Sequence, residues 1–310
     1  MKPITFRDVG GARKTISRSA VKIAWRWFVR FITTGMMLFP LMAGAQTFGD
    51  QGVKKVTEYG AGNLVDIAAG RVPGYSAVHK FGNNLACSTS EEDIWSQGGQ
   101  YQFPISTSVV QIAAGGNAAD TAAGAGARSI QIEGLGTDWL PASARLDTNG
   151  ASASLVSTVA FSRVNRAFVV DVGTYSSVIA SAANVGQITV ISTETGHTMV
   201  AIVAAKGQSQ MGIFTIPANK TGYLMSAQFN TSATISTTVS IYKRENADDV
   251  TTPFSPKRLV TKSDELRGSD NHEFRVPIKI LAKTDIWATC LAASGSPAAT
   301  AEFDIVLEDN

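Results

Sequence analysis

The stretch AEFDIVLED, Ala301–Asp309, alternates between apolar and mostly acidic residues. Phe303, Ile305 and Leu307 fall on one side of an extended chain, and the acidic side chains fall on the other. One face of this strand is therefore expected to be buried and the other to be wet. That division is typical of antiparallel sheets, which can leave one face to solvent.

The same period of two recurs through much of the chain. In RSIQIEG, Ile130 and Ile132 share one side, while MVAIVAA, Met199–Ala205, is apolar on both sides and is expected to be central or covered. Turn-forming residues such as Asn149-Gly150 separate the extended segments. We expect strands near Ser106–Ala113, Ser129–Glu133, Leu155–Phe161, Ala167–Val172, Gln187–Ser192, Thr198–Ala204, Gly212–Ile216, Tyr223–Phe229, Ile235–Tyr242, Phe274–Ala282, Ile286–Leu291 and Glu302–Glu308.

No long amphipathic helix interrupts these segments, so a βαβ architecture is not expected. The sequence predicts a mainly β fold, with one antiparallel β-sandwich or jelly-roll over residues 105–310. Residues 47–104 are expected to form an irregular N-terminal arm with a short helix at Gly62–Arg71. The polar segment Ala247–Asn271 is expected to be a long loop or a lid over one end.

Residues 1–46 form a basic and then apolar leader with a net charge of +7, which leaves −5 for the rest of the chain. Its apolar part, Phe31–Gln46, reads FITTGMMLFPLMAGAQ. It is short for a membrane span and contains Pro40, whereas Ala43-Gly44-Ala45 suits signal-peptide cleavage. A translation start at Met42 is the third alternative, and the residues leave all three open.

The residue types that carry chemistry are scattered. His79, His197 and His272 have no Cys or His at metal-ligand spacing, and the Gly- and Ala-rich stretch 113–128 lacks the order of a phosphate-binding loop. We therefore predict no catalytic residue, no cofactor and no metal, and we expect 113–128 to be a flexible hairpin loop. Cys87 and Cys290 are 203 positions apart, and we favour free thiols because disulfide-built proteins usually use more cysteines.

Two classes of partner are not expected. The acidic body argues against a broad phosphate-binding face, and hence against specific nucleic-acid binding, although basic and aromatic residues interleave in SRVNRAF, Ser162–Phe168. Membrane association is also not expected, because the leader's apolar run is short and interrupted.

Several phrases in order carry a resemblance to a known family. They are VPGYSAVHKFGNN (Val72–Asn84), EDIWSQGGQYQFP (Glu92–Pro104), DTAAGAGARSIQIEGL (Asp120–Leu135), FSRVNRAFVVDVG (Phe161–Gly173), GIFTIPANKTGYL (Gly212–Leu224) and VPIKILAKTDIWA (Val276–Ala288), followed by AEFDIVLED. Over Val72–Asp309 the chain resembles a family of structural proteins in the virions of tailed bacteriophages, described as head-associated, decoration or fibre-like. Its members begin shortly before the first phrase and lack a basic leader.

The resemblance implies a β-rich assembly protein that is not an enzyme. It implies contacts with other virion proteins, such as the major capsid or tail and neck proteins, a homo-oligomer, and assembly into virions in the host cytoplasm. The alternative is a secreted or surface β-sandwich adhesin or carbohydrate-binding module, exported to the periplasm or the outside. Five aromatic residues are the candidates for core or interface contacts, namely Trp95, Tyr101, Phe103, Trp139 and Trp287.

Overall fold

The computed structural model describes residues 5–7, 13–15, 61–175 and 182–310. The chain divides into two compact units, Met1–Glu58 and Tyr59–Asn310. In the first unit, β1 (Thr5–Arg7) pairs antiparallel with β2 (Arg13–Thr15). The stretch 31–46, for which the sequence left three alternatives open, lies outside the described residues.

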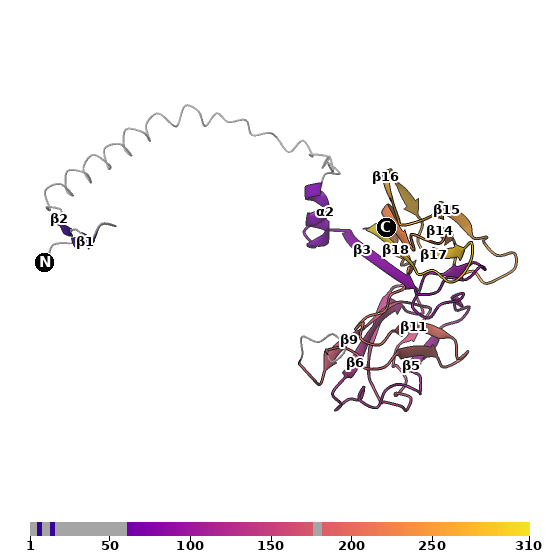
Figure 1. The fold of residues 1–310 in the computed structure, drawn as a ribbon, viewed down its shortest axis with the longest axis horizontal. Helices are drawn as coiled ribbons and strands as arrows, with labels where there is room; N and C mark the ends of the chain where they lie inside the picture. Colours follow the sequence, from indigo (N-terminus) through magenta and orange to yellow (C-terminus); the bar gives the residue numbers. More distant parts are fainter. Residues whose placement is uncertain (1–4, 8–12, 16–60, 176–181) are drawn as a thin grey trace. The chain divides into compact units, whose positions relative to one another are not determined.

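The second unit is built from antiparallel strands, so the mainly β class predicted from the sequence is confirmed. The helix expected at Gly62–Arg71 is α2, Ala61–Ala68 (Figure 1), and no helix in the described part of the chain has the length and apolarity to cross a membrane. The strands are β3 (Tyr75–Asn84), β4 (Glu92–Asp93), β5 (Ser108–Ile112), β6 (Ala127–Leu135), β7 (Pro141–Asp147), β8 (Ala160–Phe161), β9 (Arg163–Val172), β10 (Ile188–Ser192), β11 (Thr198–Ile202), β12 (Ile213–Thr215), β13 (Lys220–Thr231), β14 (Thr237–Arg244), β15 (Arg258–Leu266), β16 (Ser269–Ile280), β17 (Asp285–Ala292) and β18 (Ala299–Asp309).

The strands enclose two hydrophobic cores, where the sequence predicted a single sandwich over 105–310. The first core lies between the sheets β11-β10-β5-β8 and β7-β6-β9, and we call this part lobe 1. Ile130, Ile132 and Phe161 are among its fully buried side chains. The apolar stretch 199–205 contributes β11, which ends its sheet but is buried on both faces because β9 packs beside it. The expectation that this segment is covered is therefore confirmed.

Lobe 2 holds the second core between the sheets β16-β13-β18-β3 and β12-β17-β14-β15. The alternating stretch AEFDIVLED lies in β18, which pairs with β13 on one side and β3 on the other. Its residues Phe303, Ile305 and Leu307 enter the core, and Asp304 and Glu308 lie on the opposite face. The half-buried strand predicted from the alternating sequence is therefore confirmed.

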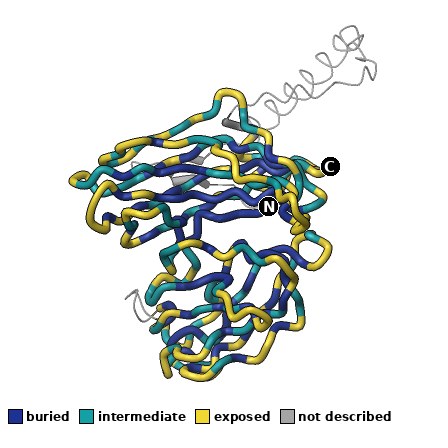
Figure 2. Tube along the Cα trace, turned by 90° about the vertical axis from the view of Figure 1, so that its right-hand side faces the viewer, coloured by how far each residue is buried: buried dark blue, intermediate teal, exposed yellow. Residues whose placement is uncertain are grey.

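One sheet faces both cores. In β17, Ile286, Ala288 and Cys290 belong to the core of lobe 2, whereas Trp287 belongs to the core of lobe 1. β12 divides in the same way, because Ile213 faces lobe 1 and Phe214 faces lobe 2. The ladder of β12 and β17 is thus a common wall, and the two groups of buried strands are visible one above the other in Figure 2.

Among the described residues of Tyr59–Asn310, four strands were not expected from the sequence. β3 and β4 lie in the arm 47–104 that was predicted to be irregular, and β7 falls between two expected strands. The fourth is β15, which with the start of β16 occupies residues 258–266 and 269–271 of the loop or lid predicted over Ala247–Asn271, so that prediction was wrong for these residues. The physical reason is burial: β15 buries only Ser263 completely and is largely exposed on both faces, so its sequence has no apolar alternation.

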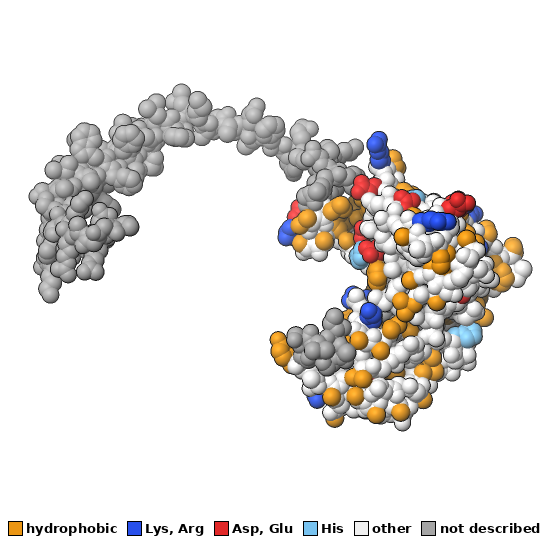
Figure 3. Space-filling view, in the orientation of Figure 1, with side chains coloured by type: hydrophobic (Ala, Val, Ile, Leu, Met, Phe, Trp, Pro, Cys, Tyr) orange, Lys and Arg blue, Asp and Glu red, His pale blue; other side chains and the backbone are white. Residues whose placement is uncertain are grey.

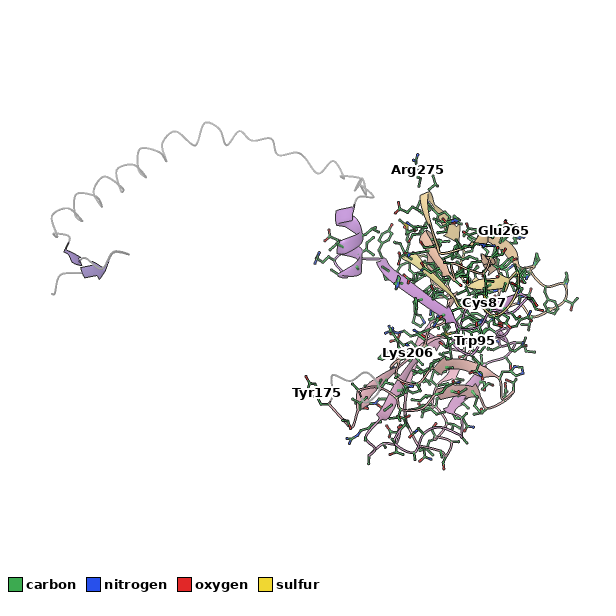
Figure 4. The ribbon with its side chains drawn as sticks, viewed as in Figure 1. Cys87, Trp95, Tyr175, Lys206, Glu265 and Arg275 are labelled. Atoms are coloured by element: carbon green, nitrogen blue, oxygen red, sulfur yellow. A yellow bond between two sulfur atoms is a disulfide. The ribbon has the colours of Figure 1, made fainter. Side chains whose placement is uncertain are left out.

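The prediction of free thiols was also wrong, because Cys87 and Cys290 form a disulfide. Cys87 follows β3, and Cys290 lies in β17, with their Cα atoms 6.1 Å apart. Both are completely buried in the core of lobe 2 (Cys87 is labelled in Figure 4). The disulfide joins the segment after the edge strand of one sheet to the central wall of the other.

Replacing both cysteines by serine is expected to lower the free energy of unfolding by about 2–5 kcal/mol, since the bond closes a long loop in the unfolded chain. Urea unfolding of the oxidised protein and the double variant measures the difference. Adding a reductant to the parent protein should reproduce most of the loss, and an unchanged midpoint in both cases would contradict the assignment.

Candidate functional site

The five aromatic residues singled out in the sequence all lie where the two lobes meet. The ring centroids of Trp95 and Tyr101 are 5.1 Å apart, those of Tyr101 and Phe103 are 5.0 Å apart, and those of Phe103 and Trp287 are 5.2 Å apart, all edge to face. This geometry is the favoured one for aromatic pairs. Trp139 joins the cluster through Arg163, whose guanidinium lies over the rings of both Trp139 and Phe103. Trp95 marks the place in Figure 4.

Arg163 of β9 lies at the centre of this cluster. Its guanidinium carbon is 4.8 Å from the ring centroid of Trp139 and 5.7 Å from that of Phe103. Nε and Nη2 donate to the two carboxylate oxygens of Asp285 in β17 at 2.9 and 3.0 Å. Both side chains are buried, so a bidentate ion pair joins lobe 1 to the common wall.

The remaining donors of Arg163 are also occupied. Nη1 donates to the carbonyl oxygens of Pro104 and Ser162, and Nη2 also donates to the carbonyl of Ala247. The hydroxyl of Thr215 donates to Asp285 at 2.7 Å. Because buried charges are tolerated only when their hydrogen-bonding groups are satisfied, this network explains how an ion pair can lie in the core.

Local backbone features allow the cluster to form. Gly134 in β6 lies against the backbone of Arg163, and a Cβ at this position would overlap the Arg163 carbonyl oxygen. Trp139 has a φ of 62°, in the left-handed region that bulky residues rarely adopt. Its own carbonyl accepts a hydrogen bond from the amide of Ala218. The structure therefore holds Trp139 in a strained conformation that places its ring over Arg163.

Asp93 borders the aromatic cluster and is buried. Burial raises the pKa of its carboxyl to about 6, and the nearby carboxylates of Glu91 and Glu92 act in the same direction. The Tyr101 amide donates to Asp93 at 2.6 Å and opposes this increase in pKa. Of the three adjacent acidic residues at 91–93, only Asp93 is buried.

A serine, a histidine and an aspartate meet in lobe 2, but not in the geometry of a nucleophilic triad. Ser263 Oγ lies 3.0 Å from His272 Nε2, and Asp270 Oδ2 lies 2.9 Å from the same nitrogen. Nδ1 of His272 forms a hydrogen bond with the hydroxyl of Thr261. In a triad the carboxylate and the hydroxyl bind opposite ring nitrogens, so this arrangement does not prepare Ser263 as a nucleophile. Asp270 and His272 are two residues apart in the sequence, and the structure brings their side chains into contact.

The other sequence features have structural roles. In the Gly- and Ala-rich stretch 113–128, the carboxylate of Asp120 accepts the amides of Ala127, Val185 and Gly186, so the loop is organised around a buried acid. His79 is paired with Asp304 on the outer face of lobe 2. Among the described residues, no group of three or more His, Cys, Asp or Glu side chains is placed to hold a metal ion.

A groove of about 790 Å³ opens between the lobes beside β3. Lys80 lies on its wall and is buried, with Nζ donating to the carbonyl of Asn165 at 2.5 Å. Burial, with the positive charge of Arg166, lowers the pKa of Lys80 to about 7. Such a shift is unusual for lysine and is characteristic of binding sites as well as of buried structural groups.

Sequence reasoning missed Arg163, Asp285 and Lys80. Two of them stand at positions where the sequence predicts burial. Asp285 directly precedes the uncharged run IWATCLA. Lys80 falls on the side of the alternating strand β3 whose other residues face the core. A charged residue at a buried position of a strand indicates a partner elsewhere in the chain. The sequence cannot name that partner, because Arg163 and Asp285 are 122 positions apart.

Comparisons with known proteins find a faint structural likeness. No protein-family model matches the sequence, and neither does any curated protein. The structure of the infectious bursal disease virus Gx strain is 8% identical, with 76% of this chain and 73% of that chain covered and a TM-score of 0.21. The T=1 particles derived from infectious bursal virus give 8% identity, coverage of 76% and 74%, and a TM-score of 0.19. The chain is an antiparallel β protein, and a likeness at these TM-scores is too small to support an argument.

Replacing Arg163 by methionine is expected to lower the free energy of unfolding by about 3–5 kcal/mol, because Asp285 would remain as a buried charge without its partner. Chemical denaturation measures the loss. Arg71→Met, which breaks the exposed Arg71–Asp66 pair on α2, is the matched control and should change stability far less. Equal effects of the two variants would contradict the role assigned to Arg163.

Asp93 is expected to make stability depend on pH between about 4 and 6. The folded pKa of about 6 lies above the ordinary value of 3.8, so the folded protein binds the extra proton in this range and loses stability as pH rises through it. Asp93→Asn should flatten this part of the stability curve and retain an acceptor for Tyr101. Asp147→Asn, at the exposed end of β7, is the control and should leave the curve unchanged, as measured by thermal unfolding at each pH.

Proposed function

We propose that the protein is a structural subunit of a bacteriophage virion, a decoration, spike or fibre-base component that acts through contacts between protein chains. Its partners are other virion proteins and further copies of itself, and it carries out no reaction. The order of sequence phrases between Val72 and Asp309 supports the virion assignment. The observation that carries the proposed mode of action is the exposure of β15 and β16.

These two strands lie at the ends of their sheets on the same side of lobe 2, and each is exposed along most of its length. Leu259 of β15 is 50% exposed, and Val276 of β16 is 82% exposed. Among the described residues, β15 pairs only with β14 and β16 only with β13. An edge strand with open backbone groups and exposed apolar side chains is a natural site of pairing with another chain.

Charges also suit this side of lobe 2 to specific contacts. Lys262 and Asp264 alternate along β15, and Glu273 and Arg275 do so along β16. Mixed charges around an apolar contact give orientation and selectivity more than affinity. The two strands therefore combine an apolar contact with an electrostatic pattern that a symmetric assembly can match.

One observation is consistent with the alternative function, a secreted or surface adhesin or carbohydrate-binding module. Cys87 and Cys290 form a disulfide, and disulfides persist in oxidising compartments. Virion surfaces are among those environments, so the bond fits both functions. Glycan binding that falls when an exposed aromatic residue such as Tyr175 is replaced would favour the alternative.

The proposal is tested by mass spectrometry of purified phage particles from an infected culture. The protein should copurify with particles at a fixed ratio to the major capsid protein. Its absence from particles, with the protein present in the lysate, would overturn the assignment.

Val276→Asp is expected to reduce the amount of protein in particles by about tenfold or more, because a charge is placed in the proposed contact. Leu155→Asp, in a loop of lobe 1 with similar exposure, is the control and should be incorporated normally. Thermal unfolding of both purified variants should match the parent. Equal incorporation of the two variants would contradict the role of β15 and β16.

A further inference from the structure

The groove between the lobes meets β3 along its edge. Six consecutive residues, Ser76–Phe81, line one side of the groove. Because successive side chains of a strand point to opposite faces, a cavity lined by consecutive residues must run beside the strand and not over one of its faces. Figure 3 shows this side of the body hollowed between the two lobes, with Lys or Arg side chains at the hollow.

The backbone of β3 is open on this side. β18 pairs with one edge of β3, and within the described residues no strand pairs with the other. Alternate amide and carbonyl groups of an edge strand point away from its sheet, and an extended chain can bond to them. Ala77 and His79 are exposed, so this part of the strand is accessible.

The groove is cationic, and one of its basic side chains has no carboxylate partner among the described residues. Arg166 and Lys220 line it together with Lys80, against the single carboxylate of Glu133. Arg166 is paired with Glu133, and Lys220 is paired with Asp309. Lys80 is 7% exposed and donates to the carbonyl of Asn165, but it forms no ion pair with any residue that the structure describes. Burial without a counter-charge disfavours the charged form of the amine and lowers the pKa of Lys80 to about 7, and a carboxylate from a ligand would favour the charged form.

The rest of the lining suits side chains of a strand. Leu135, Phe214, Pro217 and Leu307 provide apolar surface from both lobes. A strand added to β3 would direct alternate side chains toward this surface and the others toward solvent. The groove therefore offers backbone pairing, apolar contacts and one buried cation in the same place.

We propose that this groove binds an extended segment of a partner protein, which adds to the open edge of β3 as a strand and places a side-chain carboxylate against Lys80. The proposal deepens the proposed function by naming a site where a second protein docks, and it rests on that function only for the origin of the partner. The site lies on β3 and is separate from the contact proposed on β15 and β16.

The test uses the full-length protein and a capped nine-residue peptide of alternating threonine and valine with one central glutamate. Binding is measured by calorimetry, and protection of β3 is measured by hydrogen exchange. The glutamate peptide should bind and slow amide exchange within Ser76–Phe81. A peptide with glutamine in place of glutamate should bind about tenfold more weakly, and one with prolines beside the glutamate should not bind.

Variants of Lys80 separate its proposed role in binding a carboxylate from its contact with the other lobe. Lys80→Met should abolish the preference for glutamate over glutamine, whereas Lys80→Arg should keep it, because arginine retains the positive charge. Thermal unfolding shows whether each variant is folded. If Lys80→Met does not fold, the glutamate preference of Lys80→Arg and of the parent protein still tests the role of the charge. Arg71→Met, in the segment between α2 and β3, is the control and should bind as the parent does.

Three outcomes would overturn the proposal. The first is no binding of the glutamate peptide, the second is equal binding of the glutamate and glutamine peptides, and the third is binding without protection of β3. Free acetate that competes at the same concentration as the peptide would identify a site for small anions and would also overturn strand addition. None of these results depends on whether the protein is found in phage particles, so the two proposals fail separately.

Discussion

The buried ion pair of Arg163 and Asp285 is the interaction on which the arrangement of the two lobes depends. Arg163 comes from β9 in lobe 1, and Asp285 comes from β17 in the wall that both cores share. An ion pair in the core must have nearly every hydrogen-bonding group satisfied, so Pro104, Ser162 and Ala247 are also fixed around the guanidinium. Segments that are far apart in sequence are thus held to one geometry, which an apolar contact alone would specify less strictly.

The aromatic cluster and the common wall follow from this constraint. β17 is buried on both faces because it closes the core of lobe 2 with Ile286 and Ala288 and meets lobe 1 with Trp287. Tyr242 of β14 extends the row of rings, with its centroid 6.0 Å from that of Trp287. The large aromatic side chains of the junction are used to join the lobes. Contacts with other chains are therefore proposed at strand edges, where backbone groups and smaller side chains are exposed.

The groove is the other product of joining two sandwiches. Lys80 leaves a strand of lobe 2 and reaches the backbone of Asn165 in lobe 1, so its burial results from the meeting of the lobes. Its lowered pKa has the same origin, with desolvation as the largest cause. A site of this kind has no motif, because the residues that line it come from both lobes and are distant in sequence.

The sequence by itself determined the class of fold and most of the strands, because the side chains of a half-buried strand alternate with a period of two. It also singled out five aromatic residues that the structure places at the junction of the lobes, namely Trp95, Tyr101, Phe103, Trp139 and Trp287. Only the tertiary structure decided that there are two cores, that Cys87 pairs with Cys290, and that β15 is a strand. The physical reason is that periodicity reports the local contrast between buried and exposed faces. Pairing of distant residues, and strands exposed on both faces, leave no such contrast in the sequence.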